Sequence, residues 1–319
     1  MKKFVLVLSL LITSVFFLSH CYLMNSLYKS DAELDEHYRN AKVKPLYKES
    51  QFLDRTQHYV VMSKSDTLPL LVMVHGAPGA WYGYMNLTDD SLLQANFKIV
   101  AVDRLGYGKS GYGKEVLSVE EQALSIKKII ETENTSGKKV YLLGRSYGAP
   151  ITAWLAINYP QKFEKLVMVS PVIDPQKEKF YWFSDLGRST LIQWFLPSML
   201  NVATKEKFAH AREMKKMQNE WEKLCTPTYV LVGENDAIAD TSNYSYARKH
   251  ITNCSAVFMK LENTGHQITH QKPQLIKELL MEKSHCENDP LMAENKAIGS
   301  VGANTNKAIA SEHFTVLKK

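Results

Sequence analysis

KVYLLGRSYGAPITAWLAINY, residues 139–159, contains the most informative turn of the sequence. The mostly apolar stretch from Lys139 to Leu143 predicts a strand, and Tyr147 to Tyr159 predicts a helix. The pentapeptide GRSYG joins them and is a G-x-S-x-G pattern. Its glycines allow close backbone approach, and its tight turn projects Ser146 from the edge of the sheet. Ser146 is therefore a candidate nucleophile.

Strand and helix patterns alternate on both sides of this turn. One helix begins at Ser118, with Glu121 three residues later as a capping box. Strands are predicted over residues 58–63, 68–74, 98–102, 165–169, 227–232 and 256–261, of which 68–74 is a continuous apolar run. This alternation predicts an α/β fold whose sheet is mostly parallel and doubly wound, with helices on both faces.

A serine hydroxyl becomes a good nucleophile only beside a base, and that base needs an orienting acid. Asp236, in GENDAI, follows the predicted strand 227–232, and His266, in NTGH, follows the last predicted strand. Sites in parallel sheets form beyond the carboxyl ends of the strands. We therefore expect Ser146, Asp236 and His266 to be the catalytic residues.

Other residues compete for two of these roles. Asp174 also follows a strand, and Asp240 lies close to Asp236, so both are alternative acids. His270 lies one helical turn after His266 and is predicted to be a surface residue of a helix.

Two upstream motifs also follow predicted strands. HGAPG, which contains Ala77, is placed so that the backbone N–H groups of Ala77 and Tyr147 converge on a substrate carbonyl oxygen. Each such donor contributes about 3 kcal/mol to stabilising an oxyanion in comparable sites. In the second motif, DRLGYGKS, Asp103 and Arg104 are expected to brace loops rather than perform chemistry.

HGAPG, DRLGYGKS, GRSYG, GENDAI and NTGH occur in the order and spacing typical of the α/β-hydrolase superfamily, which residues 55–285 resemble. The resemblance implies the α/β-hydrolase fold, the triad and the oxyanion donors named above, and an inserted helical lid between the sixth and seventh strands. Residues 173–222 match the lid in position. Epoxide hydrolases and haloalkane dehalogenases carry Asp at the position of Ser146, in the turn between strand and helix. The serine therefore disfavours both activities.

The expected activity is hydrolysis of a carboxylic ester through an acyl-enzyme. Amide cleavage is an alternative, because HGAPG is similar to the HGGPG-like segment of proline iminopeptidases. Lid glutamates could then hold a substrate ammonium; they are Glu206, Glu213, Glu220 and Glu222. Ala77 and Tyr147 depart from that family, which has a second glycine and a tryptophan at these positions. A C–C bond hydrolase and a non-catalytic binding protein of the same fold are further alternatives.

Bulky side chains in the lid have two interpretations. They are Phe180, Tyr181, Trp182, Phe183, Trp194, Phe195 and Leu196. Placed over the site, they would form an apolar pocket for substrate. Packed against the domain, they would hold the lid in place.

The N-terminus has the layout of a bacterial export signal, since Lys2 and Lys3 precede an apolar run from Phe4 to Leu18. Residues 1–21 are expected to be either a cleaved signal, an uncleaved anchor or a lipoprotein signal with lipid on Cys21, although His20 departs from the lipobox pattern. The protein would then be membrane-anchored, periplasmic or extracellular.

The remaining segments and the composition complete these expectations. Residues 22–54 are interpreted as a polar tether and residues 286–319 as a disordered tail. Disulfide pairing among Cys225, Cys254 and Cys286 is left open. The formal net charge of +6 is spread along the 319 residues rather than clustered, which disfavours nucleic-acid binding. No cofactor is expected, because no metal-ligand cluster or phosphate-binding glycine loop is evident in the sequence.

Overall fold

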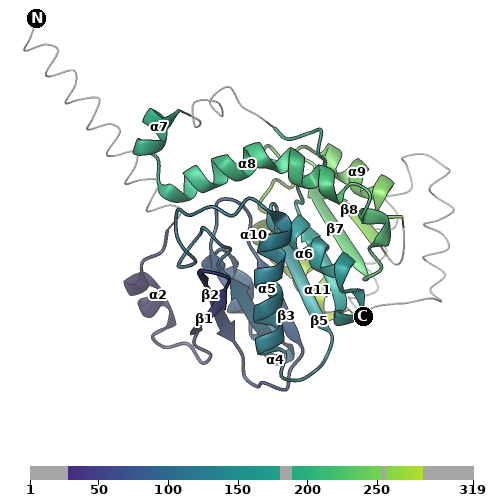
Figure 1. Cartoon of the computed structure of the whole chain (residues 1–319). Coiled ribbons are helices and arrows are strands. Elements are labelled where there is room, and N and C mark those ends of the chain that lie inside the picture. The colour runs from purple at the N-terminus through teal and green to yellow at the C-terminus, as the bar shows by residue number, and fades with distance from the viewer. Residues whose placement is uncertain (1–27, 180–188, 253–255, 283–319) are drawn as a thin grey trace, which may run out of the picture. The chain divides into compact units, whose positions relative to one another are not determined.

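The computed structural model describes residues 28–179, 189–252 and 256–282. Their strands form an 8-stranded sheet in the order β1-β2-β4-β3-β5-β6-β7-β8 (Figure 1). The strands are β1 (Leu46–Phe52), β2 (Arg55–Met62), β3 (Leu70–Val74), β4 (Lys98–Val102), β5 (Val140–Arg145), β6 (Phe163–Val169), β7 (Thr228–Gly233) and β8 (Ala256–Leu261). β2 pairs antiparallel with β1 and β4, and all other neighbours are parallel. The predicted α/β-hydrolase fold with a mostly parallel sheet is confirmed.

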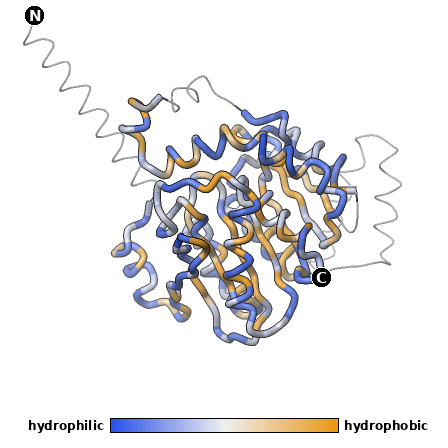
Figure 2. Tube along the Cα trace, in the orientation of Figure 1, coloured by the Kyte–Doolittle hydropathy of each residue, from blue (hydrophilic) through white to orange (hydrophobic). Residues whose placement is uncertain are grey.

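Helices cover both faces of this sheet. The helices are α2 (Asp31–Tyr38), η1 (Trp81–Tyr84), α3 (Met85–Thr88), α4 (Ser91–Asn96), α5 (Val119–Glu133), α6 (Gly148–Asn158), η2 (Pro160–Lys162), α7 (Thr190–Phe195), α8 (Ser198–Met217), η4 (Trp221–Lys223), α9 (Ser242–His250), α10 (Ile268–Gln271) and α11 (Pro273–Met281). The inner strands, from β3 to β7, are hydrophobic along most of their length, whereas polar residues recur along the helices (Figure 2). A strand buried on both faces requires this continuous apolar sequence.

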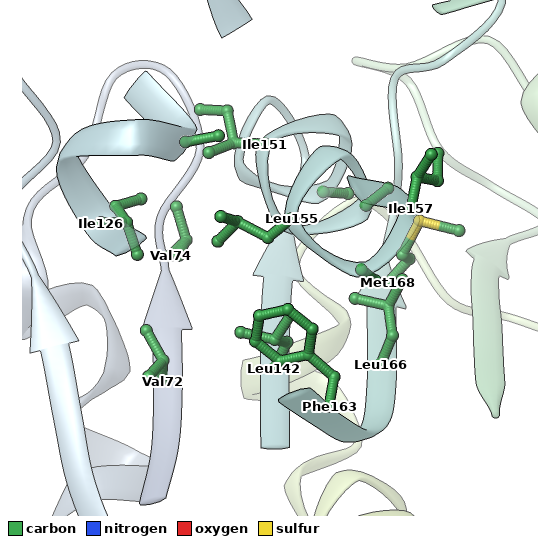
Figure 3. Packing of buried hydrophobic residues seen from close by; sticks show 14 of the residues in the cluster. Val72, Val74, Ile126, Leu142, Ile151, Leu155, Ile157, Phe163, Leu166 and Met168 are labelled. Carbon is green, nitrogen blue, oxygen red and sulfur yellow. The ribbon is translucent and has the colours of Figure 1, made fainter. Parts of the chain in front are cut away.

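Alternate residues of the strands from β2 to β8 contribute to two separate cores. Val72 and Val74 of β3 pack with α5 and α6, and Figure 3 shows Ile126 and Leu155 of those helices beside them. Leu71 and Met73 face the other way and pack with residues of η1, α4 and α11. The period-2 alternation of strand side chains thus joins both helical layers to one sheet.

The helical insertion lies between β6 and β7, as expected for a lid. Its α8 lies over the carboxyl ends of two strands: Glu206 contacts Arg104, just after β4, and His210 contacts the carbonyl of Val172, just after β6 (Figure 1). In α7, Trp194 is 86% exposed, so its side chain is not packed against the domain. Phe180 to Phe183 lie outside the described residues.

The interpretation of residues 22–54 as a tether is wrong for their described part, 28–54. Ser30 and Glu33 form a complete capping box at the start of α2, and Tyr38 donates to Asp89 at 2.7 Å. β1 forms a hairpin with β2 from Leu46 to Phe52. These residues are polar because β1 is an edge strand and α2 is mostly exposed, so their sequence lacks the apolar pattern of the inner elements.

Several predictions concern residues outside the described ranges. They are the export segment, the lipid on Cys21, Cys254 and Cys286, and the tail 286–319; all of them stay predictions. Cys225, which is described, is exposed. None of the described helices combines the length and apolar character needed to span a membrane.

Candidate active site

Ser146 lies in a strained turn between β5 and α6. Its φ is 53°, in the left-handed region that costs a non-glycine residue about 1–3 kcal/mol. A Cβ on Gly148 would come within 2.2 Å of the Val74 carbonyl oxygen, and one on Gly144 within 2.3 Å of Thr152 Oγ1. Both glycines of the motif are therefore needed for the close packing of α6 on the sheet, which holds the strained serine in place.

Asp236 and His266 meet beyond the ends of β7 and β8. Nδ1 of His266 lies 2.8 Å from Oδ2 of Asp236, while Oδ1 of Asp236 accepts hydrogen bonds from the N–H groups of Ile238 and Ala239, each at 2.8 Å. Burial alone would raise the pKa of Asp236, but the His266 hydrogen bond and charge, with the two N–H donors, lower it below its ordinary value. Asp236 thus stays ionised and can orient the imidazole.

The competing residues have other partners. Asp174 accepts hydrogen bonds from Gln176 N–H and the Ser242 hydroxyl, and Asp240 accepts from Ser242 N–H. Neither of them contacts His266. His270 is exposed in α10, as predicted for a surface helix residue.

The end of β6 connects Ser146 with His266. Ser146 N–H donates to the Val169 carbonyl at 2.9 Å, and the hydroxyl of the next residue, Ser170, donates to the His266 carbonyl at 2.8 Å. Within the described ranges, the Ser146 hydroxyl and the His266 ring form no direct hydrogen bond. Catalytic hydrogen bonds are often long before substrate binds, so this geometry is compatible with a triad. Nothing in the sequence around Ser170 marked it for this role.

The two expected oxyanion donors lie on separate segments, each next to Ser146. Tyr147 is the N-cap residue of α6, where backbone N–H groups have no partner within the helix. The loop with Ala77 passes so close to the GRSYG turn that a Cβ on Gly76 would lie 2.8 Å from Ser146 Cβ. The two segments that carry these N–H groups are thus adjacent to the candidate nucleophile.

His75 fixes the conformation of that loop. Its Nε2 accepts from Arg104 N–H at 3.0 Å, so the neutral ring carries its proton on Nδ1 and donates it to Gly76 O at 2.7 Å. Burial, followed by the charge of Arg104, lowers the pKa of His75 well below its ordinary value. His75 is therefore a neutral brace and not a second base.

Asp103 and Arg104 brace loops, as predicted. Asp103 accepts from Trp81 N–H at 2.8 Å and from Lys109 N–H at 3.0 Å, and it contacts the His58 ring at 2.8 Å. Arg104 forms a fully buried, bidentate ion pair with Glu206 of α8, with N–O distances of 2.8 and 2.9 Å. The lid partner of Arg104 could not be identified from sequence spacing.

Most of the lid glutamates proposed for a substrate ammonium already have cationic partners. Glu206 binds Arg104, Glu213 binds Lys216 at 2.8 Å, and Glu220 binds Lys223 at 2.8 Å. Glu222 is exposed on η4. In the described residues there is also no group of three or more His, Cys, Asp or Glu that could hold a metal ion.

Comparison with known proteins gives a consistent result. The family described as α/β hydrolase fold matches residues 69–217. The AB hydrolase superfamily protein YfhM of Bacillus subtilis is 21% identical, covering 71% of this chain and 93% of its own. Human monoacylglycerol lipase ABHD6 is 21% identical, covering 67% and 74%. A hydrolase structure from Pseudomonas aeruginosa superposes with a TM-score of 0.58 at 15% identity, covering 74% and 97%.

Proposed function

Since the chain belongs to the α/β-hydrolase superfamily, we propose that it is a serine hydrolase that cleaves carboxylic esters through an acyl-enzyme. Hydrolase activity in general is supported by its lipase- and esterase-like relatives, such as the protein named monoacylglycerol lipase. The observation that carries the serine mechanism is the strained Ser146 turn at the same sheet edge as the Asp236–His266 pair.

In the proposed reaction, Ser146 Oγ attacks the ester carbonyl carbon while His266 Nε2 takes the hydroxyl proton. Asp236 holds the protonated imidazole in orientation and stabilises its charge. The carbonyl oxygen becomes an oxyanion that accepts hydrogen bonds from the N–H groups of Ala77 and Tyr147. His266 then gives its proton to the departing alkoxide, which leaves as the alcohol.

Water completes the cycle. His266 removes a proton from water as it attacks the acyl-enzyme, and a second oxyanion forms at the same two N–H groups. When this intermediate collapses, the acid departs and His266 returns the proton to Ser146 Oγ. Every proton is therefore moved by one histidine, and Asp236 stays ionised throughout.

Amide cleavage by an aminopeptidase-like route has less support. Such a site needs an unpaired carboxylate for the substrate ammonium, and three of the four candidate lid glutamates are paired with Arg104, Lys216 and Lys223. Displacing Glu206 from Arg104 would leave a buried, uncompensated charge, which costs about 3–5 kcal/mol.

The test is hydrolysis of p-nitrophenyl esters of increasing acyl length, a monoacylglycerol, and leucine and proline p-nitroanilides. The proposal expects ester turnover by the wild type and by Ser65→Ala, a control that removes an exposed hydroxyl, and none above background by Ser146→Ala. Turnover of the anilides alone would replace the esterase proposal with amide hydrolysis. Ester turnover that survives in Ser146→Ala would exclude the serine mechanism.

A further inference from the structure

The buried Arg104–Glu206 pair joins the lid to the loop that carries one expected oxyanion donor. We propose that Glu206, on α8, is a positioning residue that acts through Arg104 to orient and polarise the Gly76–Ala77 peptide. This inference rests on the proposed function, because it assigns a role in the same oxyanion hole. It makes a docked lid helix part of the catalytic apparatus rather than only a cover.

The key contact is on the Gly76 carbonyl oxygen. This oxygen accepts from Arg104 Nη2 at 3.2 Å and from His75 Nδ1 at 2.7 Å. The carbonyl of Gly76 and the N–H of Ala77 belong to one planar peptide group, so fixing the oxygen also fixes the direction of the N–H. Arg104, which is charged, and His75 therefore fix the direction of the Ala77 N–H, the expected oxyanion donor.

A guanidinium on the carbonyl oxygen also changes the strength of the N–H. Positive charge beside the oxygen draws electron density along the amide, which makes its N–H a better donor. Hydrogen bonds with an ionised partner are roughly twice as strong as neutral ones, and the surroundings here are dry, with Arg104 and Glu206 both 0% exposed. His75, which is neutral, cannot supply this electrostatic contribution.

Arg104 reaches the second expected donor segment as well. Its guanidinium carbon lies 4.9 Å from the centre of the Tyr147 ring and 4.7 Å from that of Tyr107. Tyr147 supplies the other expected N–H group from its backbone. One cation therefore contacts both segments that face the candidate nucleophile.

Glu206 is what keeps Arg104 in this place. Its carboxylate receives both guanidinium nitrogens, the Tyr107 hydroxyl at 2.6 Å and Gln122 Nε2 at 3.2 Å. Burial alone would lower the pKa of Arg104, but the charge of Glu206 outweighs burial and raises it. An arginine without this carboxylate would move its charge toward water, away from Gly76.

The energetic character of the pair agrees with a positioning role. Buried ion pairs often add little net stability, because desolvation offsets their attraction. Arg104 Nε, which is also buried, has no hydrogen-bond partner among the described residues. The pair is thus not arranged for maximum hydrogen bonding, whereas its Nη2 is directed at the Gly76 oxygen.

Glu206→Gln tests the proposal, with Glu213→Gln as its matched control. Glu213 lies two turns further along the same face of α8, is 3% exposed, and links the lid to the core by accepting from Val119 N–H at 3.3 Å. It does not contact Arg104. Both variants weaken lid docking, but only Glu206→Gln disturbs the peptide beside Ser146.

The measurements are kcat and KM for a p-nitrophenyl ester, the inhibition constant of an alkylboronic acid, and Tm. Boronic acids form an anionic tetrahedral adduct with a serine, so their affinity reports on the oxyanion site. Loss of one oxyanion donor costs on the order of 10²–10³-fold in kcat, so misdirecting one is expected to cost about 10-fold or more. Glu206→Gln should lower kcat and boronate affinity by similar factors with KM nearly unchanged, whereas Glu213→Gln should lower only Tm.

Two results would overturn the proposal: wild-type kcat and boronate affinity in folded Glu206→Gln, or equal losses in both variants. If Glu206→Gln does not fold, Arg104→Lys replaces it. Lysine keeps the charge, but its single ammonium cannot contact Glu206 and Gly76 together as the guanidinium does. The same drop in kcat and boronate affinity is therefore expected. Unchanged values in Arg104→Lys would also overturn the proposal.

The outcome can be separated from that of the proposed function. Boronate binding without ester turnover in the wild type would contradict the esterase proposal, and the Glu206 comparison could still be made by boronate affinity. Ester turnover that is insensitive to Glu206→Gln would contradict only the positioning role. A wild type that binds no boronate would lack the oxyanion site on which both rest.

Discussion

The hydroxyl of Ser170 donates a hydrogen bond to the backbone carbonyl of His266 at 2.8 Å. Ser170 itself has a φ of 46°, and its N–H donates to the Leu231 carbonyl at 2.7 Å. It thereby ties the loop of the expected base to the ends of β6 and β7. A catalytic histidine needs such support, because small errors in its position reduce proton transfer.

Removing this tie should slow the reaction without abolishing it. A neutral hydrogen bond contributes about 1 kcal/mol, so Ser170→Ala should lower kcat about fivefold with little effect on KM. Steady-state kinetics on a p-nitrophenyl ester measures this. A wild-type kcat in Ser170→Ala would mean that the His266 loop is held by its other contacts.

The acid of the triad can be tested against its neighbour in the same loop. Asp236→Asn keeps the shape but lets the imidazole adopt the wrong tautomer, so kcat should fall by about 10⁴-fold, as in other serine triads. Asp240→Asn should stay within about twofold, because that carboxylate contacts Ser242 and not His266. Equal losses in the two variants, measured as kcat, would contradict the assignment of Asp236.

Sequence reasoning succeeded where chemistry demands a local pattern. The GRSYG turn is recognisable because only glycine fits at Gly144 and Gly148, and Asp236 and His266 follow strands that are mostly apolar. The buried strands β3 and β4 were predicted because their sequences are also mostly apolar.

Contacts between residues far apart in the chain could not be predicted from the sequence. Arg104 and Glu206 are 102 residues apart, and no spacing rule pairs them. Ser170 takes its role from the register of β6 beside β7. Helix α2 and strand β1 were missed because their partners, Asp89 for Tyr38 and β2 for β1, lie further along the chain.

The glycine after Tyr147 offers a test of the fold itself. A Cβ on Gly148 would lie 2.2 Å from Val74 O, a backbone atom that cannot move without distorting β3. Gly148→Ala should therefore lower the free energy of unfolding by about 3 kcal/mol or prevent folding. In Gly83→Ala, the nearest neighbour is the flexible end of Arg145 at 3.5 Å, so a change within about 0.5 kcal/mol is expected. Urea unfolding compares them, and similar losses would contradict the close approach of α6 and β3.

Lys165 should make stability depend on alkaline pH. It is fully buried in β6, with its ammonium on the carbonyls of Leu279 and Glu282, and burial lowers its pKa from 10.5 to about 8. Between pH 8 and 10.5 the unfolded chain holds this proton and the folded chain has lost it. The free energy of unfolding therefore rises with pH across this window. The stability gained in this way is lost again as the pH falls through the folded-state pKa of about 8.

The difference between wild type and Lys165→Met isolates that contribution. From pH 8 to pH 10, the wild type should gain about 2 kcal/mol relative to the variant. Urea unfolding at several pH values measures both proteins, and the tyrosines that lie away from Lys165 affect them equally. Parallel curves would show that Lys165 has an ordinary pKa in the folded protein.

Covalent labelling tests whether Ser146 is the nucleophile and whether His266 activates it. Full-length protein is treated with a fluorophosphonate, and the modified residue is located by mass spectrometry of its peptides, with Ser146→Ala and His266→Ala treated in parallel. We expect one adduct on Ser146 in the wild type, none in Ser146→Ala, and labelling at least about 100-fold slower in His266→Ala. An adduct on another residue, or labelling of Ser146 at the wild-type rate without His266, would contradict it.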